Sequence, residues 1–194
     1  MRDEVRVWMA RPPDDRDDLV RRVLAHETGA DAGSIQLDTT CRWCGDSRHG
    51  KPRALRGPPF NLAHTGGLAL VAVGTAELGV DVERDTGAAV LEGSALALSA
   101  AERAAVAAVA DPAVAFVRLW TRKEAYLKGT GKGLVEDPTA VEFGPSDGGW
   151  ETVLRAGRPT GWVVTPLALP RGYAGALAVE GPPRAVRLAA WPPG

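Results

Sequence analysis

The sequence predicts an α+β protein, in which strands and helices occupy separate stretches of the chain. Short strand-type runs open the chain and recur after residue 139, whereas two longer segments between them carry helical patterns with caps at their starts. The chain has 194 residues, of which 45% are hydrophobic. A core of ordinary size is therefore possible, in one domain or in two fused small halves.

The N-terminal region predicts one strand, one helix and a long loop-rich stretch. Residues 4–9 alternate between apolar and polar and predict an edge strand, which the pair Pro12-Pro13 ends. Residues 14–28 predict a helix with acidic side chains at its start and Gly29 at its end. Its apolar face consists of Leu19, Val20, Val23 and Leu24. Residues 31–59 are expected to be mostly loop.

Two short runs in the middle of the chain predict further strands. Residues 68–73 are all apolar and follow Gly66-Gly67, which indicates a buried strand. After a connection over residues 74–79, residues 80–83 alternate as the second strand of a hairpin would.

Two helices are then expected, followed by a series of strands. Residues 94–110 are rich in alanine and carry Ser99 and Glu102 at the spacing of a capping box. Asp111 and Pro112 are suited to the N-cap and first turn of a helix from Ala113 to about Lys128, with glycines at 129 and 131 ending it. The strand-like runs that follow are 139–143, 150–154, 160–165, 173–179 and 185–191.

Charge and hydropathy exclude several classes of protein. The formal net charge is −1, so nothing global indicates binding to nucleic acid or to an anionic membrane. No apolar run approaches the ~18 residues of a membrane helix, and the N-terminus has no signal-peptide pattern. We therefore expect a soluble, cytoplasmic protein.

The two cysteines form a single C-x-x-C pair, Cys41 and Cys44, with His49 nearby in the sequence. A structural zinc site usually has four protein ligands, and a redox pair is expected beside a βα motif that is not found here. Two thiols in a loop are the expectation, with a redox or metal protein as a remote alternative.

Acidic and basic side chains recur at spacings that suit a catalytic site. Asp81 and Glu83 would share one face of a strand, and such a pair suits Mg²⁺. Phe116, Trp120, Glu124 and Lys128 form one stripe along the second helix. Each feature alone is better explained by a solvated strand face or an exposed Glu–Lys pair. His64 alone is most often a structural residue.

Taken together, four blocks resemble the Sfp-type 4′-phosphopantetheinyl transferases. FNLAHT at 60–65 is similar to the family's F-N-x-S-H-S, and GVDVE at 79–83 is similar to its G-[IV]-D-[IV]-E. FVRLWTRKEAYLKGTGKGL at 116–134 is similar to the longer block F-x-x-x-W-[ST]-x-K-E-[AS]-x-x-K-x-x-G-x-G-L, and GKP at 50–52 to a shorter one. The long block is specific, and the four occur in the family's order.

The resemblance implies an Mg²⁺-dependent enzyme that moves the phosphopantetheine arm of coenzyme A to a serine of an apo acyl or peptidyl carrier protein. Adenosine 3′,5′-bisphosphate is released. The implied fold is two similar α+β halves in one chain, residues 1–75 and 79–194, with the active site between them. A monomer that serves polyketide, nonribosomal-peptide or fatty-acid carriers is the expectation.

The resemblance also assigns roles to individual residues. Asp81, Glu83 and Glu124 would hold Mg²⁺, with Glu124 also the general base for the serine hydroxyl. Lys128 would neutralise charge on the bridging phosphate oxygens. Coenzyme A would be contacted by His64, Thr65, Lys51 and Lys128. Trp120 and Lys123 would place the helix and support the site.

The sequence departs from the family pattern in two places. Ala63 and Thr65 replace the usual serines around His64. The N-terminal region is short, so the basic residues that hold the 3′-phosphate of coenzyme A in the family have no aligned equivalent. Arg16, Arg21 or Arg22 are candidates to replace them. The alternative to an active enzyme is an inactive coenzyme A or carrier-protein binding module with the same fold.

Overall fold

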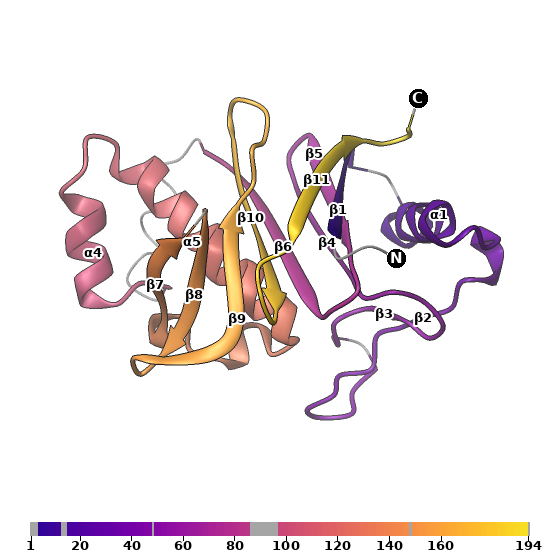
Figure 1. The fold of residues 1–194 in the computed structure, drawn as a ribbon, viewed down its shortest axis with the longest axis horizontal. Coiled ribbons are helices and arrows are strands. Elements are labelled where there is room, and N and C mark those ends of the chain that lie inside the picture. The colour runs from indigo at the N-terminus through magenta and orange to yellow at the C-terminus, as the bar shows by residue number, and fades with distance from the viewer. Residues whose placement is uncertain (1–3, 13–14, 48, 86–96, 148, 194) are drawn as a thin grey trace.

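The computed structural model describes residues 4–12, 15–47, 49–85, 97–147 and 149–193 of the 194-residue chain. Its two main sheets lie side by side, with helices outside each of them (Figure 1). A small pair of strands, β2 (Leu37–Asp38) and β3 (Arg53–Ala54), lies beside the first sheet. The α+β class predicted from the sequence is confirmed.

The first sheet has the strand order β11 (Ala185–Ala190), β1 (Glu4–Ala10), β5 (Leu68–Val73) and β4 (Phe60–Thr65). Helix α1 (Arg16–Thr28) packs its predicted apolar face against one side of this sheet. The prediction that residues 4–9 form an edge strand is wrong. Strand β1 is interior because the last strand of the chain, β11, pairs with it in parallel.

The second sheet has the order β6 (Leu78–Arg84), β10 (Tyr173–Glu180), β9 (Arg158–Pro166), β8 (Trp150–Arg155) and β7 (Val141–Asp147). The strand-like runs predicted after residue 139 are therefore confirmed, four of them in this sheet. The predicted hairpin between residues 68–73 and 80–83 is wrong. Strand β5 pairs with β4, whereas β6 pairs with β10 in the other sheet.

A shared apolar core joins the two sheets. Strands β1 and β5 contribute Val5, Val7 and Leu70 to it, and β6 contributes Val80 and Val82 from the second sheet. These strands alternate between faces, so the opposite face of β6 carries Gly79, Asp81 and Glu83. That opposite face is covered by helix α5 (Pro112–Thr130), whose Ala125 and Leu127 pack with Ala176 and Ala178 of β10.

The predicted helix signals are confirmed, with one correction. Helix α4 (Ala100–Ala107) has a complete capping box between Ser99 and Glu102, and Asp111 caps α5, in which Pro112 occupies the first turn. Residues 94–96 of the predicted alanine-rich helix lie outside the described residues. Gly129 does not end α5: the helix continues to Thr130, and Gly131 caps it with a left-handed φ of 72°.

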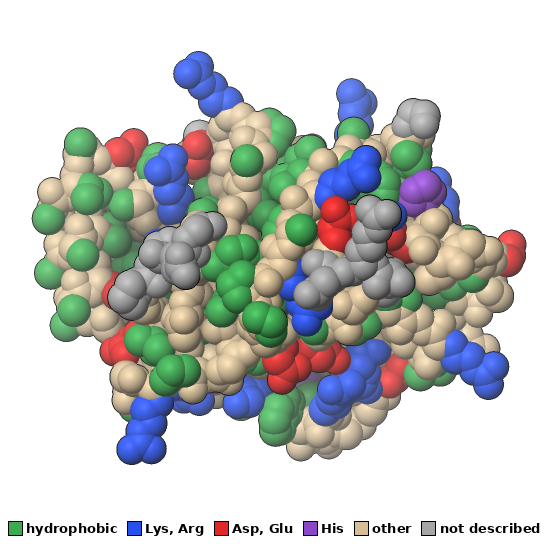
Figure 2. Space-filling view, in the orientation of Figure 1, with side chains coloured by type: hydrophobic (Ala, Val, Ile, Leu, Met, Phe, Trp, Pro, Cys, Tyr) green, Lys and Arg blue, Asp and Glu red, His purple; other side chains and the backbone are tan. Residues whose placement is uncertain are grey.

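Short turns of 3₁₀ helix complete the described chain: η1 (Ala32–Ser34), η2 (Gly133–Val135) and η3 (Pro138–Ala140). None of the described helices is long and apolar enough to cross a membrane. Basic and acidic side chains are interspersed over the face shown in Figure 2, in keeping with the small net charge.

Candidate active site

The predicted acidic and basic residues of β6 and α5 lie together in the structure. Asp81 and Glu83 leave β6 on the face that α5 covers, and Glu124 and Lys128 leave α5 one turn apart. Lys128 Nζ lies 2.5 Å from Asp81 Oδ1. The interpretation of Asp81 and Glu83 as a solvated strand face is wrong, because Asp81 is only 2% exposed and Glu83 is half-buried.

Two glycines allow α5 to approach β6 closely enough to form this cluster. A Cβ atom on Gly79 would overlap the Ala125 carbonyl oxygen and the backbone of Gly129. A Cβ atom on Gly129 would lie 2.5 Å from the Trp162 ring. The absence of side chains at these two positions therefore allows the short distance between Asp81 and Glu83 of the strand and Glu124 of the helix.

Burial and mutual repulsion disfavour the charged forms of the three acids. Burial is the main cause that raises the pKa of Asp81 above its ordinary value, and the Lys128 ammonium opposes it. Burial also raises the pKa values of Glu83 and Glu124, and the Asp81 charge raises both further. A group of like charges that destabilises itself in this way is typical of a site that binds a cation or moves a proton.

The donor set fits a hard divalent cation such as Mg²⁺. All three side chains offer carboxylate oxygens, and Asp81 Oδ2 is buried without a hydrogen-bond partner. In this structure Asp81 is paired with Lys128, and the carboxylate oxygens of Asp81, Glu83 and Glu124 do not all lie within 4.8 Å of one another. The chemistry of the ligands is therefore suitable, whereas a closed coordination shell would require side-chain movements.

His64 and Thr65 lie at the end of β4, where His64 contacts α1 and Thr65 contacts β6. Arg16 Nη1, in the first turn of α1, donates to His64 Nε2 over 3.1 Å. A hydrogen bond from Thr65 to Glu83 lowers the pKa of that carboxyl group, against the larger effect of burial. Thr65 is thus linked directly to the acidic cluster, whereas His64 lies at the exposed surface with Arg16.

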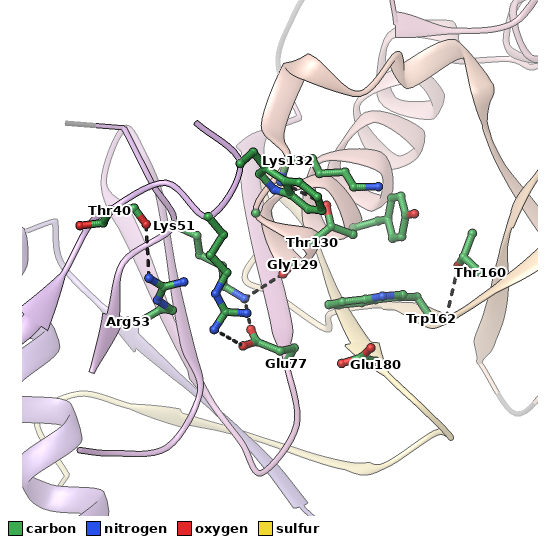
Figure 3. A pocket seen from close by; sticks show the side chains of 14 residues that line it. Thr40, Lys51, Arg53, Glu77, Gly129, Thr130, Lys132, Thr160, Trp162 and Glu180 are labelled. Atoms are coloured by element: carbon green, nitrogen blue, oxygen red, sulfur yellow. Dashed lines mark hydrogen bonds and ion pairs between the residues drawn. The ribbon is translucent and has the colours of Figure 1, made fainter. Parts of the chain in front are cut away.

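Lys51 does not pair with Asp81, Glu83 or Glu124, and instead connects three other segments of the chain. Its ammonium donates to Glu77 Oε2 over 2.7 Å and to the Leu78 and Gly129 carbonyl oxygens over 2.8 Å each. Burial lowers the pKa of Lys51, and the Glu77 carboxylate opposes that effect. Figure 3 shows Lys51 pointing at Glu77 and Gly129 within a pocket of about 330 Å³.

A larger cavity of about 1360 Å³ connects Lys51 with Lys128. Its walls are the loop before β3, the start of β4 at Asn61 and Leu62, and the C-terminal end of α5 with the residues that follow it. This volume exceeds the ~300–1,000 Å³ of typical small-molecule sites. A large, flexible substrate could therefore lie along it, although His64 and Glu124 are not among its lining residues.

Asn61 was not assigned a role from the sequence, and Arg16 was one of three candidates for a single role. Asn61 is buried, and its Oδ1 accepts a 2.9 Å hydrogen bond from the Val80 backbone N–H. This bond ties β4 to β6 and so aligns Thr65 with the acids. Arg16 was one of three candidates, and only tertiary structure shows that it reaches His64. The sequence feature that could have pointed to a role for Asn61 is its position in the FNLAHT block.

Lys123 and Trp120 are placed as supports of α5. Lys123 is fully buried and donates to Glu102 Oε2 over 2.7 Å and to the Pro138 carbonyl oxygen over 2.8 Å. Trp120 stacks on Phe116, with ring centroids 6.4 Å apart, in the apolar cluster that joins α4 to α5. Neither side chain is part of the acidic cluster.

Comparison with known proteins identifies the family. The model of the 4′-phosphopantetheinyl transferase superfamily matches residues 77–178, which include α5 and the second sheet except for the last two residues of β10. This match covers more than half of the chain, and the protein therefore belongs to the 4′-phosphopantetheinyl transferase superfamily.

The chain is also similar to individual proteins. The chain is 34% identical over 122 residues to the 4′-phosphopantetheinyl transferase HetI of Nostoc sp.. The aligned residues cover 61% of this chain and 51% of HetI. The chain thus spans about half the length of this curated relative. The holo-[acyl-carrier-protein] synthase of Thermotoga maritima superposes with a TM-score of 0.45 at 21% identity, over 56% of this chain and 64% of that one.

Proposed function

We propose that this protein is an Sfp-type 4′-phosphopantetheinyl transferase that modifies an apo acyl or peptidyl carrier protein. The observation that carries the proposal is the cluster of Asp81, Glu83, Glu124 and Lys128 between β6 and α5, in a member of the superfamily. A domain that only bound coenzyme A would have no use for three half-buried or buried carboxylates whose pKa values are all raised.

In the proposed reaction, the serine oxygen of the carrier protein attacks the phosphorus that bears the pantetheine arm. The bond between this phosphorus and the bridging oxygen breaks, and adenosine 3′,5′-bisphosphate leaves. Glu124, whose pKa is raised by burial and by neighbouring charges, accepts the serine proton directly or through water. Lys128 stabilises the charge that develops on the bridging phosphate oxygens.

Asp81, Glu83 and Glu124 would hold Mg²⁺, because they offer the hard oxygen ligands that this ion prefers and Asp81 Oδ2 is buried without a partner. When bound, the ion would offset the negative charge of the pyrophosphate so that an oxygen nucleophile can approach. Lys128, which is paired with Asp81 in this structure, would then be released toward the phosphate groups.

The phosphate groups of coenzyme A would lie against the end of β4. His64 and Thr65 are the proposed contacts there, and Arg16 completes a basic pair with His64. Arg21 and Arg22 are engaged elsewhere, with Asp17 and Asp18 one turn earlier in α1. Lys51 remains a proposed contact of the nucleotide end, through the pocket that it lines.

The proposal includes the division of the chain into two similar halves. Residues 74–77 carry the chain from the first sheet to the second, close to the predicted join at 75–79. Strand β11, from the second proposed half, pairs with β1 of the first, so the two proposed halves together form one compact unit. The carrier protein that is modified, a monomeric state and a cytoplasmic location stay predictions.

The test is a carrier-protein modification assay read by mass spectrometry. The protein is incubated with coenzyme A, Mg²⁺ and apo carrier proteins of polyketide, nonribosomal-peptide and fatty-acid type. We expect the mass of at least one carrier to increase by one phosphopantetheine arm. Glu124→Ala should lower the rate by ~10²–10⁴-fold, the usual contribution of a general base.

Glu142→Ala, which removes an exposed carboxylate from β7, is the matched control and should leave the rate unchanged. If no carrier is modified although calorimetry shows that coenzyme A binds, the protein is an inactive binding module and the proposed activity is wrong.

A further inference from the structure

The loop between β2 and β3 brings three soft metal ligands together. The Sγ atoms of Cys41 and Cys44 and a ring nitrogen of His49 all lie within 4.8 Å of one another. Cys44 Sγ is 3.1 Å from His49 Nε2, and the two cysteines are not joined in a disulfide. The structure has two free thiols in a loop, as expected from the sequence, and folding adds the His49 imidazole to the pair.

The backbone around the cysteines has the form of a tight knuckle. The Gly45 N–H donates to the Cys41 carbonyl over 2.9 Å, and Gly45 has a left-handed φ of 76° that turns the chain back. The Cys41 N–H in turn donates to the Asp46 carbonyl over 2.8 Å, so backbone hydrogen bonds close the turn around the two sulfurs.

The two ends of the loop are held so that His49 returns to the cysteines. The Gly50 N–H donates to the Thr39 carbonyl over 2.7 Å, and Thr39 Oγ1 donates to the Ser47 carbonyl over 2.7 Å. A Cβ atom on Gly50 would overlap the backbone of residues 39–41, so this crossing requires glycine. Backbone hydrogen bonds within the loop therefore help to place the imidazole beside the sulfurs.

We propose that Cys41, Cys44 and His49 form a binding site for Zn²⁺ that is separate from the carboxylate cluster. Two thiolates and one imidazole are ligands that zinc prefers, whereas Mg²⁺ prefers oxygen. Tetrahedral coordination at Zn–S of ~2.3 Å and Zn–N of ~2.0 Å needs only small side-chain movements from the observed cluster. Water fills the fourth position, which the exposure of Cys44 and His49 leaves open to solvent.

The position of the site suggests what a bound ion would stabilise. Cys41, Cys44 and His49 line the same 1360 Å³ cavity as Lys128, and Lys51 follows His49 by two residues. Trp43, inside the knuckle, lies over the ammonium of Lys132 at 5.3 Å. An ion held by the loop would fix this wall of the cavity, and the stability of the loop would then depend on metal.

The experiment measures metal content, which does not depend on enzymatic activity. The full chain is purified without a polyhistidine tag from cells grown with added zinc, and zinc is measured by elemental mass spectrometry. We expect about one zinc ion per chain. Replacement by Co²⁺ should give the absorption bands of a tetrahedral cobalt–thiolate complex. Cys44→Ser and His49→Gln, both at exposed positions, should each lower the zinc affinity at least tenfold.

His64→Gln and Glu124→Gln are the matched controls, and both should retain zinc because their side chains lie outside the loop. The proposal is overturned if the wild-type chain, with its cysteines reduced, takes up neither zinc nor cobalt when the metal is added. It is also overturned if zinc is lost with Glu124→Gln but not with Cys44→Ser, which would place the ion at the carboxylates. A stable Cys41–Cys44 disulfide in the freshly purified chain, with no zinc bound, would equally contradict it.

Discussion

Arg16 donates to the imidazole of His64, and this contact distinguishes it from the other arginines of α1. No carboxylate of the described residues pairs with Arg16, whereas Arg22 is 2.7 Å from Asp18 and Arg21 is 4.0 Å from Asp17. A guanidinium beside an imidazole, without an acidic partner among those residues, is suited to an anion.

From this contact we predict a specific effect on the use of coenzyme A. Arg16→Ala should raise the KM for coenzyme A by ~10–100-fold, because a hydrogen bond to a charged group contributes ~1.5–3 kcal/mol. The KM for dephospho-coenzyme A, which lacks the 3′-phosphate, should change little. Steady-state kinetics with both substrates provide the measurement, with Arg22→Ala as the control. An equal rise for both substrates would show that Arg16 does not contact the 3′-phosphate.

Glu124 gives a second prediction at this scale, on the pH dependence of stability. Its pKa is raised in the folded state by burial and then by Asp81 and Glu83. Between the ordinary pKa of 4.5 and the raised pKa of the folded state, the folded chain therefore binds more protons than the unfolded chain. The free energy of unfolding falls as the pH rises through this range. Without divalent cations, Glu124→Gln should melt above the wild type at pH 7, by ~2–4 °C for each 1 kcal/mol gained.

The difference in Tm between Glu124→Gln and the wild type should shrink as the pH falls through 4.5, because Glu124 then becomes protonated in the unfolded state as well. Thermal unfolding in a chelating buffer at several pH values measures it, and the exposed Glu142→Gln is expected to show no such dependence. A variant that melts below the wild type at pH 7 would mean that the Glu124 carboxylate is stabilised in the fold rather than repelled.

At the scale of elements, the contact between β6 and α5 depends on Gly79. A methyl group there would overlap the Ala125 carbonyl and the Gly129 backbone, which cannot move as a flexible side chain could. We predict that Gly79→Ala lowers the free energy of unfolding by ~1–3 kcal/mol, the usual cost of overpacking, and separates Asp81 from Lys128. Chemical denaturation and the transferase assay provide the two measurements.

Gly144→Ala on β7 is the matched control, because the nearest atom to its added Cβ would be 3.5 Å away. A Gly79→Ala variant as stable and as active as Gly144→Ala would show that the close approach of α5 to β6 is not required.

The sequence predicted the type of most elements but not their partners. The all-apolar run at 68–73 is a strand with every residue buried, and the cap residues of α4 and α5 act as expected. The pairing of β5 with β6 and the edge position of β1 were wrong. Periodicity reports which face of a segment is apolar, whereas pairing is decided by which strands meet across the core.

At the scale of the whole molecule, strand β11 forms one edge of the first sheet, beside β1. Strand β11 pairs along β1 from Glu4 with Ala185 to Met9 with Ala190, and Val186 and Leu188 pack on the core that joins the two sheets. Trp191 packs edge-on against Trp8, with ring centroids 5.4 Å apart. The first and last segments of the chain therefore stabilise each other.

We predict that deletion of residues 185–194 removes a large part of the stability. Burial of two aliphatic side chains and one indole contributes on the order of 5 kcal/mol, which is comparable with the ~5–15 kcal/mol of a whole domain. Calorimetry should show a strongly lowered Tm or aggregation. Ending the chain at Trp191 is the control. Cooperative unfolding of the shorter chain near the wild-type Tm would contradict this role of β11.

The sequence alone determined the class of the fold, the caps of the helices and which acids share a face. It could do so because these properties depend on neighbours within a few residues, and its four motifs indicated the family. Tertiary structure alone decided that Asp81 is buried against Lys128 and that Arg16 reaches His64. Contacts of this kind depend on where the core brings distant segments together, which local periodicity does not encode.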